Sequence, residues 1–90
     1  MFHIHWSEMS EITYAEILEP LSQDDALELD EKVEELIDRL RLYRFFCPPS
    51  KIHPNLRNCI VNKKIGLVYQ VDKQVVSLLY FYYQKSSMQR

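Results

Sequence analysis

The side chains of this sequence that are best suited to chemistry are cations and tyrosines in its second half. Attack of a ribose 2′-hydroxyl on a phosphodiester, the step that cleaves RNA, needs a base, an acid and cations around the phosphate. Five residues could serve such a step, namely Arg57, Lys63, Lys64, Tyr82 and Lys85. The cations are therefore available, and a tyrosine could stack on a base or donate a proton.

The proton-transfer pair is the weak part of this set. The second half of the chain has one carboxylate, Asp72, in an expected hairpin turn, and one histidine, His53, in a proline-rich loop. The sequence contains no CxxC, no HExxH and no acidic ligand cluster, so we predict neither a metal site nor a cofactor. We lean toward a protein that acts without catalysis and keep RNA cleavage as an alternative.

Charge is divided unevenly along the chain. Residues 1–45 carry twelve acidic side chains against four basic ones, a net charge of −8, and residues 46–90 carry one acid against seven bases, a net charge of +6. A basic surface can meet nucleic acid or an acidic peptide. The two halves could equally attract each other within one fold.

Length and composition indicate one small folded domain spanning residues 1–90. The chain is 47% hydrophobic and 27% charged, which is typical of a folded protein. No apolar run approaches the roughly 18 residues of a membrane span, and no secretory signal is recognisable. We therefore expect a cytoplasmic protein with no membrane partner, in which Cys47 and Cys59 are reduced because disulfides are rare in that compartment.

Hydrophobic periodicity gives the elements that must position these side chains. Alternation predicts a strand at 2–6, and spacings of three and four predict a helix at 8–19 after the capping Ser7. A second helix is expected after Ser22, with an apolar stripe from Ala26 to Tyr43. The remaining predicted segments are a loop at 46–55, strands at 56–61, 65–71 and 75–83, and a frayed end at 86–90.

The predicted order is β-α-α-β-β-β, which places the chain in the α+β class. The two helices would form a hairpin packed on one face of a mainly antiparallel sheet. In this arrangement an acidic helical layer lies against a basic sheet.

The order and spacing of these elements resemble the RelE/ParE toxin superfamily, and the ParE-like members more closely. The resemblance is carried by Trp6-Ser7 at the end of the first strand, the helical hairpin, Leu56-Arg57 followed by Ile60-Val61, the run Leu67-Val68-Tyr69-Gln70-Val71, and the aromatic last strand. Two features depart from the family. The sequence pI is near 5.9, below that of many RelE-like members, and Lys85 stands where the family often has an arginine.

The resemblance implies the toxin component of a type II toxin–antitoxin system, with growth inhibition and plasmid stabilization as its effects. A ParE-like toxin would inhibit DNA gyrase and be neutralised by a cognate antitoxin, with Arg57, Tyr82 and Lys85 as contact residues and an exposed edge strand open to an added strand. The first alternative is a RelE-like endonuclease that cleaves mRNA on the ribosome, for which Arg57, a turn lysine and Lys85 would converge with a tyrosine on one concave sheet face. The second is a degenerate member that acts only by protein binding. A homo-oligomer or a toxin–antitoxin hetero-oligomer is possible.

Overall fold

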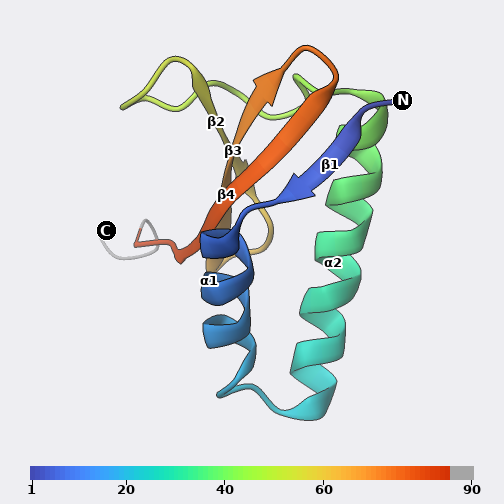
Figure 1. The fold of residues 1–90 in the computed structure, drawn as a ribbon. Helices are drawn as coiled ribbons and strands as arrows, with labels where there is room; N and C mark the ends of the chain where they lie inside the picture. Colours follow the sequence, from blue (N-terminus) through green and yellow to red (C-terminus); the bar gives the residue numbers. More distant parts are fainter. Residues whose placement is uncertain (86–90) are drawn as a thin grey trace.

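A computed structural model describes residues 1–85, which form two helices and four strands in the predicted order (Figure 1). The elements are β1 His3–Trp6, α1 Glu8–Leu18, α2 Gln23–Leu42, β2 Leu56–Ile60, β3 Ile65–Asp72 and β4 Val75–Tyr83. Each predicted segment is confirmed to within about two residues. The expectation of a frayed end concerns residues 86–90, which lie outside the described residues.

Both helices begin at the serines that the sequence indicates. The Ser7 side chain accepts a hydrogen bond from the Ser10 N–H at 3.0 Å, and the Ser22 side chain accepts one from the Asp25 N–H at 3.1 Å. Each bond satisfies one of the free N–H groups of a first helical turn. The predicted apolar stripe of α2 is buried from Leu29 to Leu40, but Tyr43 is 64% exposed because the helix ends before it.

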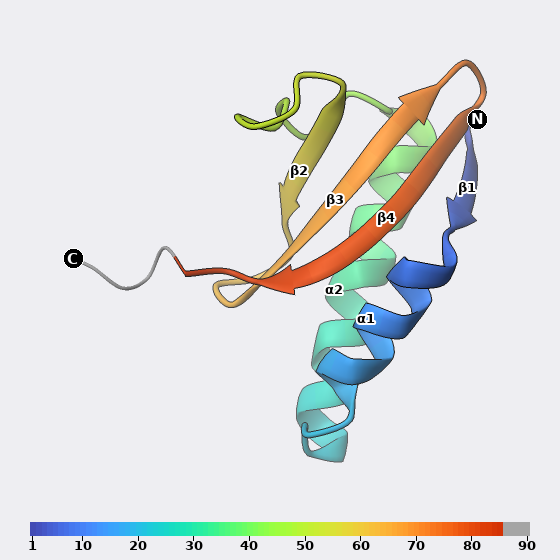
Figure 2. The same cartoon turned by 60° about the vertical axis from the view of Figure 1, so that its left-hand side comes forward.

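The strands form one sheet in the order β1-β4-β3-β2. Only the pairing of β1 with β4 is parallel, so the sheet is mainly antiparallel as predicted. Both helices lie on the same side of it (Figure 2). We call the opposite side the open face of the sheet.

Strand alternation decides which side chains reach which face. The cross-strand row of Cys59, Leu67 and Phe81 is buried on the helix side. The neighbouring row, Asn58, Val68 and Tyr80, must therefore point to the open face. A bulge at Val68 and Tyr69 inserts one extra residue in β4 and shifts its alternation, so that Phe81 and Leu78, three positions apart, both lie on the helix side.

Candidate functional site

Tyr82 makes the main side-chain contacts described on the open face. The Tyr82 hydroxyl donates a hydrogen bond to Asn58 Oδ1 at 2.6 Å, and its ring lies 6.2 Å from that of Tyr80 in an edge-on arrangement. A Cβ atom at Gly66 would collide with the end of the Tyr82 ring. The absence of a side chain at Gly66 therefore allows the Tyr82 ring to pack directly against the backbone of β3.

The candidate lysines gather at the end of the sheet near Tyr82. Asn62 shapes the turn between β2 and β3, because its Oδ1 accepts hydrogen bonds from the N–H groups of Lys64 at 2.7 Å and Ile65 at 2.8 Å. The Gln84 N–H donates to the Lys64 carbonyl at 2.8 Å, which brings the exposed Lys85 to the same end.

A hollow of about 540 Å³ lies beside this turn on the helix side. It is lined by residues of α1, α2, the turn and β4, among them Asp25, Glu28, Lys32, Lys63, Lys64 and Tyr83. The fold thus brings helix carboxylates next to the turn lysines. Asp25 and Glu28 of α2 supply carboxylates near the turn lysines, whereas the second half of the chain has only Asp72.

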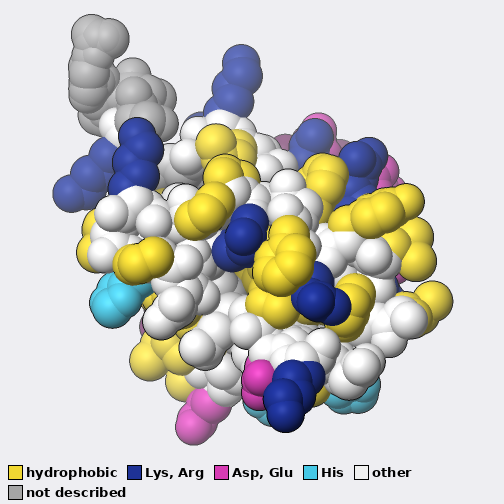
Figure 3. Space-filling view, turned by 90° about the horizontal axis from the view of Figure 1, so that it is seen from above, with side chains coloured by type: hydrophobic (Ala, Val, Ile, Leu, Met, Phe, Trp, Pro, Cys, Tyr) yellow, Lys and Arg dark blue, Asp and Glu magenta, His cyan; other side chains and the backbone are white. Residues whose placement is uncertain are grey.

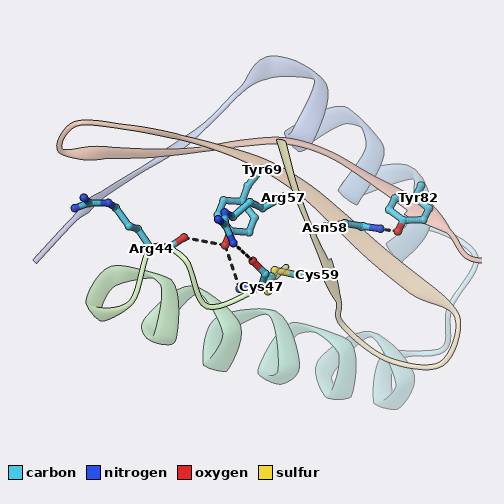
Figure 4. The surroundings of a disulfide bond; sticks show 7 residues. All are labelled: Arg44, Cys47, Arg57, Asn58, Cys59, Tyr69 and Tyr82. Carbon is cyan, nitrogen blue, oxygen red and sulfur yellow. Dashed lines mark hydrogen bonds between the residues drawn. A yellow bond between two sulfur atoms is a disulfide. The ribbon is translucent and has the colours of Figure 1, made fainter. Parts of the chain in front are cut away.

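Arg57 lies on the other side of the sheet. Its cross-strand partner is the fully buried Tyr69, and its Nη1 donates a hydrogen bond to the Cys47 carbonyl at 2.6 Å (Figure 4). The guanidinium also lies 4.7 Å from the centre of the Phe45 ring. Arg57 therefore contacts the segment that follows α2 and not the open face.

Tyr69 of β3 also holds the segment that follows α2. Its hydroxyl donates to the Arg44 carbonyl at 2.8 Å and accepts from the Cys47 N–H at 3.3 Å. Burial raises the pKa of Tyr69, while the Cys47 N–H and the charge of Arg57 oppose that rise. The tyrosine is therefore held in its neutral form, in which it can donate.

The structure places Lys63, Lys64, Lys85 and Tyr82 at the same end of the sheet, with Tyr82 on the open face and the two turn lysines beside the hollow on the helix side, and it leaves Arg57 apart. Arg57 and Ile60, the β2 residue in register with Gly66 and Tyr82, are three positions apart, about 10 Å along the strand. Arg57 also faces the helix side. The convergence expected of an endonuclease therefore does not occur for Arg57, because residues an odd number apart on a strand point to opposite faces.

The expectation of two reduced cysteines is wrong in this structure. Cys47 and Cys59 form a disulfide with a Cα–Cα distance of 5.3 Å (Figure 4). The bond ties the loop to β2, where Ser50 N–H donates to the Leu56 carbonyl and Asn58 N–H to the Pro48 carbonyl. The sequence argument rested on the redox compartment and had no means of placing the two thiols side by side.

The same loop changes the expected edge strand. Pro48 and Ser50 cover the first half of the outer edge of β2, and the exposed Ile60 lies beyond them. The part of the outer edge of β2 that is available for an added strand is therefore short.

Several residues that shape the open face or the segment after α2 escaped sequence analysis, namely Asn58, Gly66, Phe45 and Tyr69. Only Gly66 left a signal, because it is the single glycine of the chain and lies within a strand. An isolated glycine in a strand indicates a bulge or a close approach.

Within residues 1–85, no three His, Cys, Asp or Glu side chains gather in a way that could hold a metal ion. Neither described helix has the length and apolar character needed to cross a membrane.

Comparison with known proteins gives matches in structure only. No family model and no curated sequence matches the chain. Three similar solved structures are a YoeB/ParE toxin from Agrobacterium tumefaciens (16% identity, TM-score 0.72, 93% of this chain and 100% of that chain covered), the chromosomal ParDE system of P. aeruginosa (12%, 0.76, 94% and 98%) and a YoeB–YefM complex from Staphylococcus aureus (16%, 0.66, 94% and 99%).

These matches cover nearly the whole chain at identities of 12–16%. They define the class of fold: a helical hairpin on a mainly antiparallel four-stranded sheet. The chain shares this fold with the YoeB and ParE toxins, which confirms the fold expected from the resemblance of its sequence.

Proposed function

We propose that residues 1–90 form one toxin domain of a type II toxin–antitoxin pair, which acts by binding a protein. The proposed target is DNA gyrase, as for ParE-like toxins, and the proposed antagonist is a cognate antitoxin. The fold supports the toxin–antitoxin part of this proposal, because the similar structures include ParDE and YoeB–YefM assemblies.

The observation that carries the proposal is the uncharged centre of the open face. The residues in register with Tyr80 and Tyr82 are Asn58, Ile60, Gly66 and Val68, and none of them is an acid, a base or a histidine. Tyr82 has its hydroxyl bound to a carboxamide, and Ile60 is 69% exposed. Exposed aromatic and aliphatic side chains without charge suit a protein interface better than a phosphodiester.

One observation favours the RelE-like alternative. The hollow beside the β2–β3 turn joins Asp25 and Glu28 to Lys63, Lys64 and Tyr83. There a carboxylate could accept the 2′-hydroxyl proton as that oxygen attacks phosphorus, the lysines could stabilise the phosphorane, and Tyr83 could protonate the 5′ oxygen as the P–O5′ bond breaks. In this reading the substrate lies beside the turn and not across the open face.

For the antitoxin we propose contacts at Tyr82 as an aromatic anchor and at Lys85 and Arg57 as charged groups. Arg57 uses one N–H donor, on Nη1, for the Cys47 carbonyl. The other N–H groups of its guanidinium remain for a carboxylate. Charge reversal at Arg57 and Lys85 together should weaken antitoxin binding in titration calorimetry. Unchanged affinity would remove these two residues from the interface.

The function is tested by inducing the chain in bacteria without an antitoxin and following labelled thymidine and methionine over the first minutes. The proposal requires thymidine incorporation to fall first, and purified chain to inhibit gyrase supercoiling. An earlier fall in methionine incorporation that is abolished by Lys63→Ala/Lys64→Ala would favour the endonuclease. Unchanged incorporation with soluble protein would contradict both.

A further inference from the structure

A second surface lies at the end of the molecule where α2 stops and β2 begins. Three arginines there lie over phenylalanine rings. Arg44 is 4.6 Å from the centre of the Phe2 ring and 4.8 Å from that of Phe45, Arg57 is 4.7 Å from Phe45, and Arg39 is 5.4 Å from Phe46. We call these six residues the arginine–phenylalanine cluster.

The positive charge of the cluster is not neutralised by a neighbouring ion pair. In the part of the chain that the structure describes, the one side-chain ion pair joins Arg41 to Asp38 at 2.8 Å. Stacking on a ring holds a guanidinium in place while leaving its N–H edge available. Arg44 and Arg57 thus keep donors that a carboxylate could accept in a bidentate way.

The aromatic part of the cluster is also accessible. Phe45 is 56% exposed and Phe46 is 47% exposed, although phenylalanine is usually buried. Seen from above, this end of the molecule shows hydrophobic side chains interleaved with Lys and Arg side chains (Figure 3). Alternating apolar and cationic groups on one surface are typical of a protein-binding hot spot.

A hollow of about 370 Å³ gives the surface a concave part. Its lining includes Arg44, Phe45, Arg57 and Lys73, with Asp72 as the one carboxylate. Oδ1 of Asp72 accepts a hydrogen bond from the Lys73 N–H at 2.8 Å, so part of its charge is already used. Three cations against one acid favour an anionic ligand.

The backbone under the cluster is held rigidly. Tyr69 bonds the Arg44 carbonyl and the Cys47 N–H, Arg57 bonds the Cys47 carbonyl, and the disulfide ties Cys47 to Cys59. A surface ordered before binding loses little conformational entropy when a partner arrives.

From these contacts we infer that the arginine–phenylalanine cluster is a docking site for an acidic peptide segment with apolar side chains between its carboxylates. The carboxylates pair with Arg44 and Arg57, and the apolar side chains cover Phe45 and Phe46. Nucleic acid fits less well. The acidic face of α2 leads up to the cluster, so a phosphate on every nucleotide would be repelled more strongly than the spaced carboxylates of a short peptide.

This surface is separate from the open face that carries the proposed function, and it shares only Arg57 with the proposed antitoxin contacts. Arg57 and its neighbours lie on the helix side of the sheet, whereas Tyr82 lies on the opposite side. A failure of the docking site and a failure of the proposed function are therefore distinguishable.

The test measures binding of the full chain to a short fluorescent peptide in which glutamate alternates with leucine. Arg44→Glu should weaken binding about tenfold or more, since a central arginine contact is lost and a repulsive charge added. The matched control Lys64→Glu makes the same charge change at the far end of the sheet and should alter affinity less than about twofold. Phe45→Ala, which keeps every charge, should also weaken binding.

Arg44→Glu should leave the fold intact because Tyr69 bonds the backbone carbonyl of Arg44 and not its side chain. Phe45→Ala should do so because the Phe45 ring is more than half exposed. A peptide with glutamine in place of glutamate should not bind. Equal losses in Arg44→Glu and Lys64→Glu would overturn the proposal. Failure of the glutamate peptide to bind would also overturn it. So would labelled oligothymidylate that binds more tightly than the peptide and loses its binding in Arg44→Glu.

Discussion

The open face around Tyr82 and the arginine–phenylalanine cluster use the same strands in opposite ways. Tyr82 lies on the bare backbone of Gly66 and bonds a neutral amide of β2. The cluster holds charged guanidinium groups over phenylalanine rings. The disulfide at Cys59, two residues after Arg57 in β2, ties the segment that carries Phe45 and Phe46 to the strand. The centre of the open face is uncharged and shaped by the missing side chain of Gly66, whereas the cluster is cationic and is held by stacking on phenylalanine rings and by the disulfide. A small sheet can thus present two chemically different surfaces.

The largest effect should come from removing the link under the cluster. Cys47→Ser/Cys59→Ser should lower the free energy of unfolding by about 3 kcal/mol, because the disulfide closes a loop between residues 12 apart. Urea unfolding measures the loss, and a thiol reductant should produce the same loss in the unmodified chain. A change below about 1 kcal/mol would mean that the hydrogen bonds around Cys47 hold the loop unaided.

A smaller effect should come from the hydroxyl that joins the same segment to β3. Tyr69→Phe leaves the Cys47 N–H and the Arg44 carbonyl without their partner and should cost about 2 kcal/mol at neutral pH. The variant should also weaken binding of the acidic peptide. An unchanged unfolding curve would show that water replaces the hydroxyl and that the segment is less fixed than the contacts imply.

The same residue predicts a pH dependence. The pKa of Tyr69 is raised by burial, so folding favours the protonated phenol. Its contribution to stability is complete below the ordinary tyrosine pKa of about 10 and is lost as the pH rises through the raised value. Stability should therefore fall above about pH 10. Tyr69→Phe should reduce the fall, and Tyr14, whose pKa burial and the Asp30 carboxylate also raise, should account for the remainder.

The smallest of these effects should come from the open face. Gly66→Ala forces the Tyr82 ring away from Asn58, and because a tyrosine can swing aside the cost should be about 1 kcal/mol. In a double-mutant cycle with Tyr82→Ala the two losses should not add, since the second change removes the clash. Additive losses would show that Gly66 is needed for the strand itself and not as a seat for Tyr82.

The elements of this fold could be predicted because their signals are local. Ser7 and Ser22 mark the helix starts, and alternation marks the strands to within about two residues. Tyr43 shows the limit of the method, because its spacing continues the stripe of α2 although the helix has already ended.

The candidate site was predicted less completely. Residue type alone suggested Lys63, Lys64, Tyr82 and Lys85, and the fold places them at one end of the sheet, where their role stays a prediction. Arg57 has the same residue type but belongs to the other surface. Phe45 and Tyr69 carry no signal of function, because an aromatic residue in a sequence is more often part of the core.

The sequence by itself determined the order of helices and strands, the division of charge and the class of fold, since each follows from residues close together in the chain. Only the tertiary structure decided that Cys47 meets Cys59, that Tyr82 lies on Gly66, and that Arg57 and Tyr82 face opposite ways. Those outcomes depend on strand register. A shift of one residue in pairing exchanges the two faces of a strand, and the register is set by turn geometry and by burial against segments far apart in the chain.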